Sequence, residues 1–379
     1  MRGLLHLTME PKFAIDDLRF LQNIHTTARQ LPVITKIVTF LDDKQLHKRV
    51  LEKLLVAWSI NQEEVNESYK RGKGKITNDN KKTNALRHYL DASTTLGLTI
   101  KYNDLFKNTK ISRVFLSLYH NEDDSYKKKL SEKAFYIFQL LRQDADAIIQ
   151  CLEQLKDKSN KIQKHLQEEF RNSFNERLIL KTNHAQGKAK FKISEKYRTI
   201  NFIWKKPEKY AEHIIAPRYE WLSNLELVRI SRQDRKTSYS CSHTGELFLD
   251  NLPSFAENSR LIDISDEWIN NSFFSFLSKV FEMENTKAFE DLPQIDQEKE
   301  LGVSLNGALK INQSSMAFKM PLSETLFYIC THLLLNKKII LNFSTLKETM
   351  KNDFSFEGNH FLIRDTGRPS ESYITVTKR

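Results

Sequence analysis

One pattern occurs three times in this chain: a helix with apolar residues at helical spacing ends at a turn and leads into a β-hairpin. The predicted helices cover residues 84–96, 211–225 and 344–351. Alternating apolar and polar residues predict the strands, at 98–102 with 111–116, 227–230 with 239–242, and 359–363 with 373–376. Basic residues stand at the predicted hairpin tips, 107–110, 232–236 and 365–369. Short helices joined to isolated hairpins restrict the chain to a mainly helical fold with small sheets.

Glycine and proline are scarce, which supports the same fold class. The chain has 10 Gly and 8 Pro among 379 residues. Few glycines mean few turns with positive φ, so a sandwich or barrel is disfavoured, as is a glycine-rich nucleotide-binding loop. A hydrophobic content of 40% is enough to bury sizeable cores. We therefore expect a mainly α chain with small β-hairpins, arranged as tandem domains connected by long helices.

The hairpin domains are expected to alternate with helical segments. The predicted boundaries are a helical segment at 1–41, hairpin domains at 42–120, 194–253 and 302–379, a long helical segment at 121–193, and a helical segment with an acidic linker at 254–301. The linker is inferred from the excess of Asp and Glu at 282–300. Residues 69–82 hold six Lys or Arg and two Gly, a composition that predicts a mobile basic loop.

The net charge of +11 favours a polyanionic partner. DNA, RNA and an anionic membrane surface are the natural candidates, whereas a Lys-rich proteome would give the same charge without such a partner. Phosphate contacts require cations or amide donors. The candidate nucleic-acid-binding residues are Lys70, Arg71, Lys73, Lys75, Lys81, Lys82, Arg87, Lys107, Lys110, Arg113, Lys188, Lys190, Lys192, Arg232, Arg235, Lys236 and Arg368. Duplex DNA is the favoured partner, and no membrane partner is expected.

The helix before each hairpin is the candidate for contacts with bases. Asn84 and Arg87 lie at the start of the first such helix, and these residue types form bidentate contacts with adenine and guanine edges. In the second helix the polar residues are His213, Arg218 and Glu220, and the small number of cations weakens a base-reading role.

The third hairpin tip contains the tripeptide Gly367-Arg368-Pro369. Such a tripeptide can lay an extended Arg into a narrow minor groove, whose negative potential attracts it. The alternative interpretation is an ordinary hairpin turn with a solvated Arg.

Residues 130–180 form the longest predicted helical stretch. Apolar residues follow spacings of three and four in part of it, which is a heptad-like seam. The seam consists of Ile148, Leu152, Leu155, Ile162 and Leu166. It predicts one of two arrangements. The helix packs within its own domain, or it forms a coiled coil with a partner protein or with a second copy of the chain.

We find no set of residues in the sequence at a spacing typical of a catalytic or metal-binding site. We therefore expect no catalytic residue, cofactor or metal ligand. The three cysteines, Cys151, Cys241 and Cys330, are far apart and odd in number, which predicts reduced core thiols and a cytoplasmic location. His243 follows Cys241 and His332 follows Cys330 at the i+2 position, but neither pair is accompanied by a Cys-x-x-Cys motif.

The helix–hairpin pattern resembles the winged helix-turn-helix superfamily. The resemblance is clearest where the helix at 210–222 leads through Leu225-Glu226-Leu227-Val228 into a hairpin that exits at Thr244-Gly245-Glu246-Leu247-Phe248. It implies a helix for the major groove and a wing for the backbone or minor groove. Many members of the superfamily bind DNA and others bind only proteins. Large tandem winged-helix chains look like accessory subunits of bacterial DNA-processing or anti-phage systems, and like plasmid replication initiators.

Three functions are therefore open. The first is a DNA-binding protein without catalytic activity, in which basic hairpins and loops supply the electrostatics. The second is an interaction scaffold whose winged helices dock partner proteins. The third is a metal-dependent nuclease, which requires a carboxylate cluster that the sequence does not show. Asp291, Asp296 and Glu298 have the right residue types, but they fall in the predicted linker and are interpreted as a run of charge.

Overall fold

A computed structural model describes residues 15–22, 24–119, 128–157, 159–233, 236–255, 261–312, 319–351, 354–368 and 371–378. The chain is mainly helical with small sheets, which confirms the expected class at this level. It divides into two compact units. Unit 1 contains the described residues up to Gln22 together with Leu140–Ile269, and unit 2 contains Asn23–Gln139 together with Asn270–Arg379, in so far as these are described.

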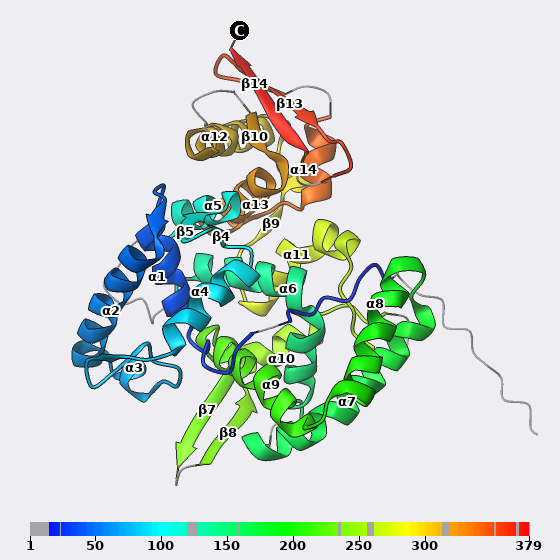
Figure 1. The fold of residues 1–379 in the computed structure, drawn as a ribbon. Coiled ribbons are helices and arrows are strands. Elements are labelled where there is room, and N and C mark those ends of the chain that lie inside the picture. The colour runs from blue at the N-terminus through cyan, green and yellow to red at the C-terminus, as the bar shows by residue number, and fades with distance from the viewer. Residues whose placement is uncertain are drawn as a thin grey trace, which may run out of the picture. The chain divides into compact units, whose positions relative to one another are not determined.

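One order of elements occurs three times along the chain: a helix, a short strand, a second helix directly after it, a third helix and a two-stranded hairpin (Figure 1). Copy 1 consists of α1 (Leu31–Leu41), β1 (Leu46–His47), α2 (Lys48–Val65), α4 (Ala85–Thr95), β4 (Thr99–Tyr102) and β5 (Leu105–Asn108). Copy 2 consists of α6 (Leu130–Glu153), β6 (Lys161–Ile162), α7 (Gln163–His184), α9 (Pro207–Asn224), β7 (Val228–Gln233) and β8 (Lys236–Cys241). Copy 3 consists of α12 (Gln294–Asn312), β10 (Lys319–Pro321), α13 (Leu322–His332), α14 (Phe343–Thr349), β13 (Asn359–Arg364) and β14 (Tyr373–Lys378).

The strand pairing is the same in all three copies. The short strand pairs antiparallel with the second strand of the hairpin, as β1 with β5, β6 with β8 and β10 with β14. The first hairpin strand then pairs on the far side of the second. Because the short strand runs directly into the second helix, this pairing ties each hairpin to the start of that helix and fixes its direction.

Further elements are inserted between and after the copies. They are α3 (Glu67–Arg71), β2 (Thr77–Asn78), β3 (Lys81–Lys82), α5 (Lys110–Leu118), α8 (Gly187–Arg198), a π-helical turn η1 (Thr199–Ile203), α10 (His243–Asp250), α11 (Asp266–Val280), β9 (Lys287–Ala288), η2 (Phe289–Asp291), η3 (Leu333–Lys337), β11 (Ile339–Ile340) and β12 (Phe354–Phe356). β9 and β11 pair in parallel. Within the described residues, none of the helices combines the length and apolar character that a membrane span requires.

Aromatic side chains form the core of unit 2. Phe115 of α5 packs on Phe135 at a centroid distance of 4.6 Å, and Phe138 stacks on Phe327 of α13 at 4.4 Å. Phe274 packs on Phe343 of α14. All are buried, so α5, the first part of α6, α11 and the helices α13 and α14 of copy 3 share one apolar core within this unit.

Buried ion pairs join the segments of unit 1. The Lys181 Nζ contacts Asp146 at 2.9 Å and Asp263 at 2.6 Å, and all three side chains are almost fully buried. Arg177 pairs with Asp146 at 3.0 Å. Burial alone would raise the pKa of Asp146, but the charges of Lys181 and Arg177 outweigh burial and hold that pKa below its ordinary value. Burial raises the pKa of Asp263. The charge of Lys181 lowers it, but the nearby Asp146 carboxylate acts in the same direction as burial, so the pKa stays above its ordinary value.

A second buried pair in unit 1 fixes α9. Arg218 forms a bidentate pair with Asp144, with both nitrogen–oxygen distances at 2.7 Å, and donates to the Leu21 carbonyl. Asp144 interrupts α6 with non-helical backbone angles. Arg218 and Glu220 are buried, so these two polar residues are not available for contacts with bases, in line with the weak base-reading role expected of this helix.

The first hairpin differs from its prediction. Its turn lies at Asn103 and Asp104, and the predicted second strand at 111–116 is part of helix α5. Asn108, which was expected in a turn, is buried in β5 and donates its side-chain amide to the Val38 and Asp42 carbonyls at the end of α1. The hairpin tip is therefore not basic.

The long helix and the linker also differ from their predictions. Residues 130–180 form two helices, α6 and α7, with β6 between them. The seam residues Ile148, Leu152, Leu155 and Leu166 are buried within unit 1, so they are not available for a coiled coil with a partner. The acidic stretch at 282–300 is not a plain linker, because it forms β9, η2 and the first turns of α12.

Candidate nucleic-acid interface

Helix α4 presents one polar face to solvent and is held rigidly on the other. Asn84, Arg87, Asp91 and Thr94 are exposed at spacings of three and four residues, which places them on one face. On the buried side, the Tyr89 hydroxyl accepts from the Arg29 and Gln30 backbone N–H groups and donates to the Gly74 carbonyl. The helix is thereby fixed to the segment before α1 and to the basic insertion at 69–82.

That insertion contains the end of α3 and the β2–β3 hairpin, where the sequence predicted a loop. Tyr69 and Ile76 are buried, and the Ile76 N–H donates to the Tyr69 hydroxyl at 3.0 Å. Strands β2 and β3 form a hairpin whose turn, Asp79 and Asn80, has positive φ at both positions. This is the signature of a type I′ turn, which matches the twist of the two strands. The Thr77 hydroxyl fixes the hairpin to Glu63 of α2.

The β2–β3 hairpin delivers lysines to the start of α4. Lys81 and Lys82 are exposed on β3, and the exposed face of α4 follows two residues later. The N-terminus of a helix also carries a partial positive charge, which adds to the local attraction for anions. We call the surface formed by Lys75, Lys81, Lys82, Asn84 and Arg87 the basic face of copy 1.

The charges on this face are only lightly neutralised. Lys82 pairs with Glu52 at 2.7 Å, and Arg87 lies 3.9 Å from Asp91. Such exposed pairs are worth at most about 1 kcal/mol each and are easily exchanged for phosphate contacts. Lys75 and Lys81 form no ion pair within the described part of the chain. On α3, Lys70 and Arg71 both pair with Glu67, and Lys73 is exposed beside them.

The three candidate DNA-binding residues predicted at the tip of the first hairpin lie away from its turn. Lys107 is exposed in the middle of β5 opposite Ile100, and Lys110 is the first residue of α5. Arg113 lies one turn further along α5 and pairs with Asp43 at 3.3 Å. The three side chains therefore do not form the predicted wing tip.

The second hairpin has the predicted form, but one of its cations is neutralised. β7 and β8 pair from Val228 with Cys241 to Gln233 with Lys236 (Figure 1). Arg232 contacts both carboxylate oxygens of Glu220, at 2.6 and 2.8 Å. Lys236 is exposed, and Arg235 lies outside the described residues. Arg229 is also exposed on β7, a position that strand alternation could have indicated.

Residues 177–209 hold ten Lys or Arg against Glu195 and Glu208, and the structure divides these cations into buried and exposed ones. Arg177 and Lys181 belong to the buried ion pairs of unit 1, and Lys196 lies over the Phe20 ring at 3.8 Å. Lys188 and Lys190 are exposed on α8. Lys192, also on α8, pairs with Asp17 at 2.7 Å.

The third hairpin tip is organised by Asp365. Its carboxylate accepts from the Lys347 Nζ at 2.8 Å and from the Gly367 N–H at 3.0 Å. These hydrogen bonds, Lys347 first, lower the pKa of Asp365 to about 2. Arg368 is exposed and pairs with Glu371 at 3.1 Å, as expected for an ordinary solvated turn.

The thiols are core residues. Cys151, Cys241 and Cys330 are buried and unpaired with one another, and burial raises the pKa of Cys151 to about 12. A thiol in such surroundings is a poor nucleophile. Within the described residues, His, Cys, Asp and Glu side chains form no group of three or more that could hold a metal ion.

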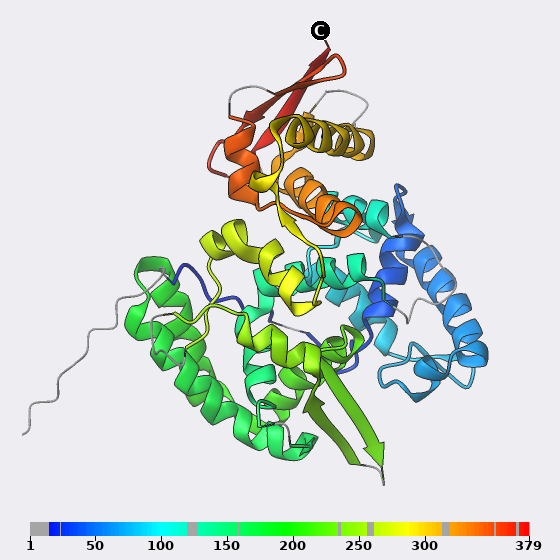
Figure 2. The ribbon, with the colours of Figure 1, turned by 180° about the vertical axis from the view of Figure 1, so that it is seen from behind.

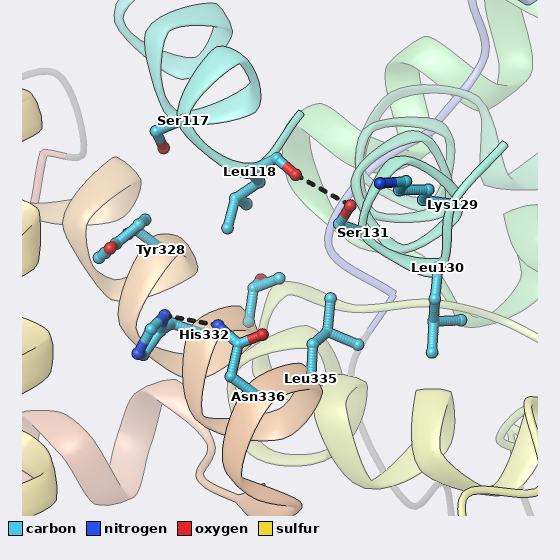
Figure 3. A pocket seen from close by; sticks show the side chains of 10 residues that line it. Ser117, Leu118, Lys129, Leu130, Ser131, Tyr328, His332, Leu335 and Asn336 are labelled. Carbon is cyan, nitrogen blue, oxygen red and sulfur yellow. Dashed lines mark hydrogen bonds between the residues drawn. The ribbon is translucent and has the colours of Figure 1, made fainter. Parts of the chain in front are cut away.

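Unit 2 contains a cavity of about 470 Å³ between the end of α5, the start of α6 and the end of α13 (Figure 3). The Ser131 hydroxyl donates to the Leu118 carbonyl on one wall, and Asn336 contacts the His332 ring on another. Burial lowers the pKa of His332, with a further contribution from Lys337. Thr331 also lines the cavity, and its buried hydroxyl has no partner among the described residues.

The Thr331→Val variant is expected to be as stable as the wild type or to gain about 1 kcal/mol, because it removes a buried hydroxyl that makes no hydrogen bond. Urea denaturation measures this change. The matched control is Thr35→Val, which removes a buried hydroxyl bonded to Tyr136 at 2.8 Å and is expected to lose about 1–3 kcal/mol. Equal losses in the two variants would contradict the expectation.

Comparisons of the chain with protein-family models, with curated proteins and with solved structures each find no match. Its function is therefore inferred from its own residues and geometry.

Proposed function

We propose that the chain is a DNA-binding protein built from three winged-helix units, with no catalytic step of its own. The repeated element order and the shared strand pairing of copies 1 to 3 support this interpretation. In a winged helix the third helix is the one that enters the major groove, which is wide enough to admit it, and the hairpin contacts the backbone beside it. In this chain the third helices are α4, α9 and α14.

Copy 1 is the copy that binds duplex DNA in this proposal. The observation that carries it is the basic face of copy 1, where the β2–β3 hairpin places Lys81 and Lys82 beside the exposed face of α4. Arg87 and Asn84 are available on that face for base edges, and the lysines are available for phosphates.

Copy 2 has a different role in this proposal. Its third helix, α9, buries Arg218 and Glu220, and Glu220 neutralises Arg232 of the hairpin. This third helix packs against its own unit, so α9 is not free to enter a groove of DNA. Copy 2 therefore supports the fold in this proposal, while copy 1 binds DNA. An accessory subunit of a bacterial DNA-processing or anti-phage system, or a replication initiator, is the biological setting that we propose for such a combination.

The test is the equilibrium binding of the full chain to a fluorescent random-sequence duplex at salt concentrations between about 50 and 200 mM. A protein that neutralises six to ten phosphates loses roughly 10³–10⁵ in affinity over this range. A loss of several orders of magnitude is therefore expected. An affinity that does not change with salt, or the absence of binding at the lowest salt, would overturn the proposal.

A further inference from the structure

Two phenylalanines of unit 1 are almost fully exposed. Phe202 of η1 is 80% exposed and Phe191 of α8 is 67% exposed. Burial of a Phe side chain is worth about 1.5–3 kcal/mol, so neither ring contributes this stabilisation to the fold. Single exposed apolar residues are ordinary, but two large rings on one helical segment point to a surface that meets another molecule.

Helical spacing places the two rings on the same face. Lys188, Phe191, Glu195, Arg198 and Phe202 follow one another at intervals of three and four residues. With a rise of 1.5 Å per residue, the two phenylalanines are separated by about 16 Å along the axis. Glu195 and Arg198 between them pair with each other at 3.0 Å.

The π-helical turn holds Phe202 outward. In η1 the Trp204 N–H donates to the Thr199 carbonyl, and Ile200 is buried. Asn201 and Asn175 of α7 donate to each other at 3.2 and 2.9 Å. Ile200 and Asn201 thus face the rest of unit 1, while Phe202 faces solvent. Figure 2 shows α7 and α8 side by side from the reverse direction.

Lysines flank the exposed rings in the sequence. Residues 187–210 hold eight Lys or Arg against Glu195 and Glu208. Five of these cations are exposed and form no ion pair within the described part of the chain, namely Lys188, Lys190, Lys205, Lys206 and Lys209. Tyr210, also partly exposed, stacks on Trp204 with an interplanar angle of 10°.

We propose that this surface, residues 187–210, binds single-stranded nucleic acid, with Phe191 and Phe202 stacking on bases and the five lysines contacting phosphates. The inference rests on the proposed nucleic-acid-binding function and assigns it a second, separate site. Aromatic rings within a positive surface suit a ligand that has both flat apolar faces and regular negative charges. A single strand offers both, whereas the bases of a duplex are stacked inside it and are out of reach of these rings.

The test uses the full chain with a fluorescent oligothymidine of about 20 nucleotides and a duplex of the same length. Base stacking on an aromatic residue is worth about 1–3 kcal/mol, so Phe202→Ala should weaken single-strand binding at least about fivefold. The double variant Phe191→Ala/Phe202→Ala should weaken it at least about 25-fold, with duplex affinity unchanged within about twofold. Phe202→Trp should retain binding. Ile295→Ala, at an apolar position of α12 that is 79% exposed, is the matched control and should have no effect.

The outcomes separate this proposal from the function on which it rests. Duplex binding without single-strand binding, or single-strand binding that the double variant leaves unchanged, overturns the stacking site and leaves the duplex function standing. An equal loss for both ligands also overturns it, because stacking discriminates between them. A wild-type dimer that the double variant converts to a monomer, with single-strand affinity unchanged, would assign the face to self-association. Absence of both kinds of binding would overturn both proposals.

Discussion

The Lys181→Met variant is expected to lose about 3–5 kcal/mol of free energy of unfolding, the largest effect on stability that we predict. Lys181 is fully buried between Asp146 and Asp263, and its removal leaves two buried carboxylates with Arg177 as the main remaining cation. Urea denaturation followed by tryptophan fluorescence suits the measurement, because Trp204, Trp221 and Trp268 lie in unit 1.

The control for this variant is Lys192→Met. Lys192 pairs with Asp17 at 2.7 Å, but both side chains are substantially exposed. An exposed pair is worth at most about 1 kcal/mol, so its loss should move the urea midpoint only slightly. If Lys181→Met unfolds at the same urea concentration as Lys192→Met, the ion pairs of unit 1 are not the constraint that we describe.

The variant Lys75→Gln/Lys81→Gln/Arg87→Gln is expected to bind duplex DNA about 100-fold more weakly at 0.15 M salt. Each phosphate contact releases about 0.9 counterion, which corresponds to roughly a fivefold change in affinity at this salt concentration. Two such contacts, from Lys75 and Lys81, give about 25-fold, and the loss of the Arg87 contact with a base edge, worth about 1–3 kcal/mol, supplies the rest of the expected factor. Fluorescence anisotropy with a labelled duplex measures it.

The matched control removes the same number of positive charges from copy 3 and from β9, the strand before it. Lys287, Lys299 and Lys310 are exposed, and the stretch that contains the first two is acidic. Substitution of all three by Gln lowers the net charge by the same amount and should change duplex affinity by less than about fivefold. Equal losses in the two triple variants would show that only the overall charge of the protein attracts DNA.

The sequence predicted the second and third hairpins but misplaced the first. The segments before and after residues 232–236 and 365–369 alternate clearly and are separated by polar residues, so their strands were identified. In the first hairpin, Asn108 resembled a turn residue, yet its amide satisfies carbonyls of α1 that are 70 and 66 residues away. A local sequence pattern cannot predict a contact between residues so far apart in the chain.

The same limit applies to the candidate site. The basic composition of residues 69–82 is evident from the sequence. The helix and hairpin that this segment forms depend on burial of Tyr69 and on the contact between Thr77 and Glu63, which the sequence does not show. Nothing in the local sequence distinguishes the buried Arg177 and Lys181 from the exposed cations nearby, because their partners Asp146 and Asp263 are distant in sequence. The strands β1, β6 and β10 have two or three residues each, too few for a periodic signal.

The most direct test of the central claim is the slope of log affinity against log salt for the wild type and for the Lys75→Gln/Lys81→Gln/Arg87→Gln variant on the same duplex. If Lys75 and Lys81 on the basic face of copy 1 contact phosphates, the magnitude of the slope should fall by about 2 in the variant. Identical slopes would show that these residues do not touch the DNA backbone and would contradict the assignment of copy 1 as the DNA-binding unit.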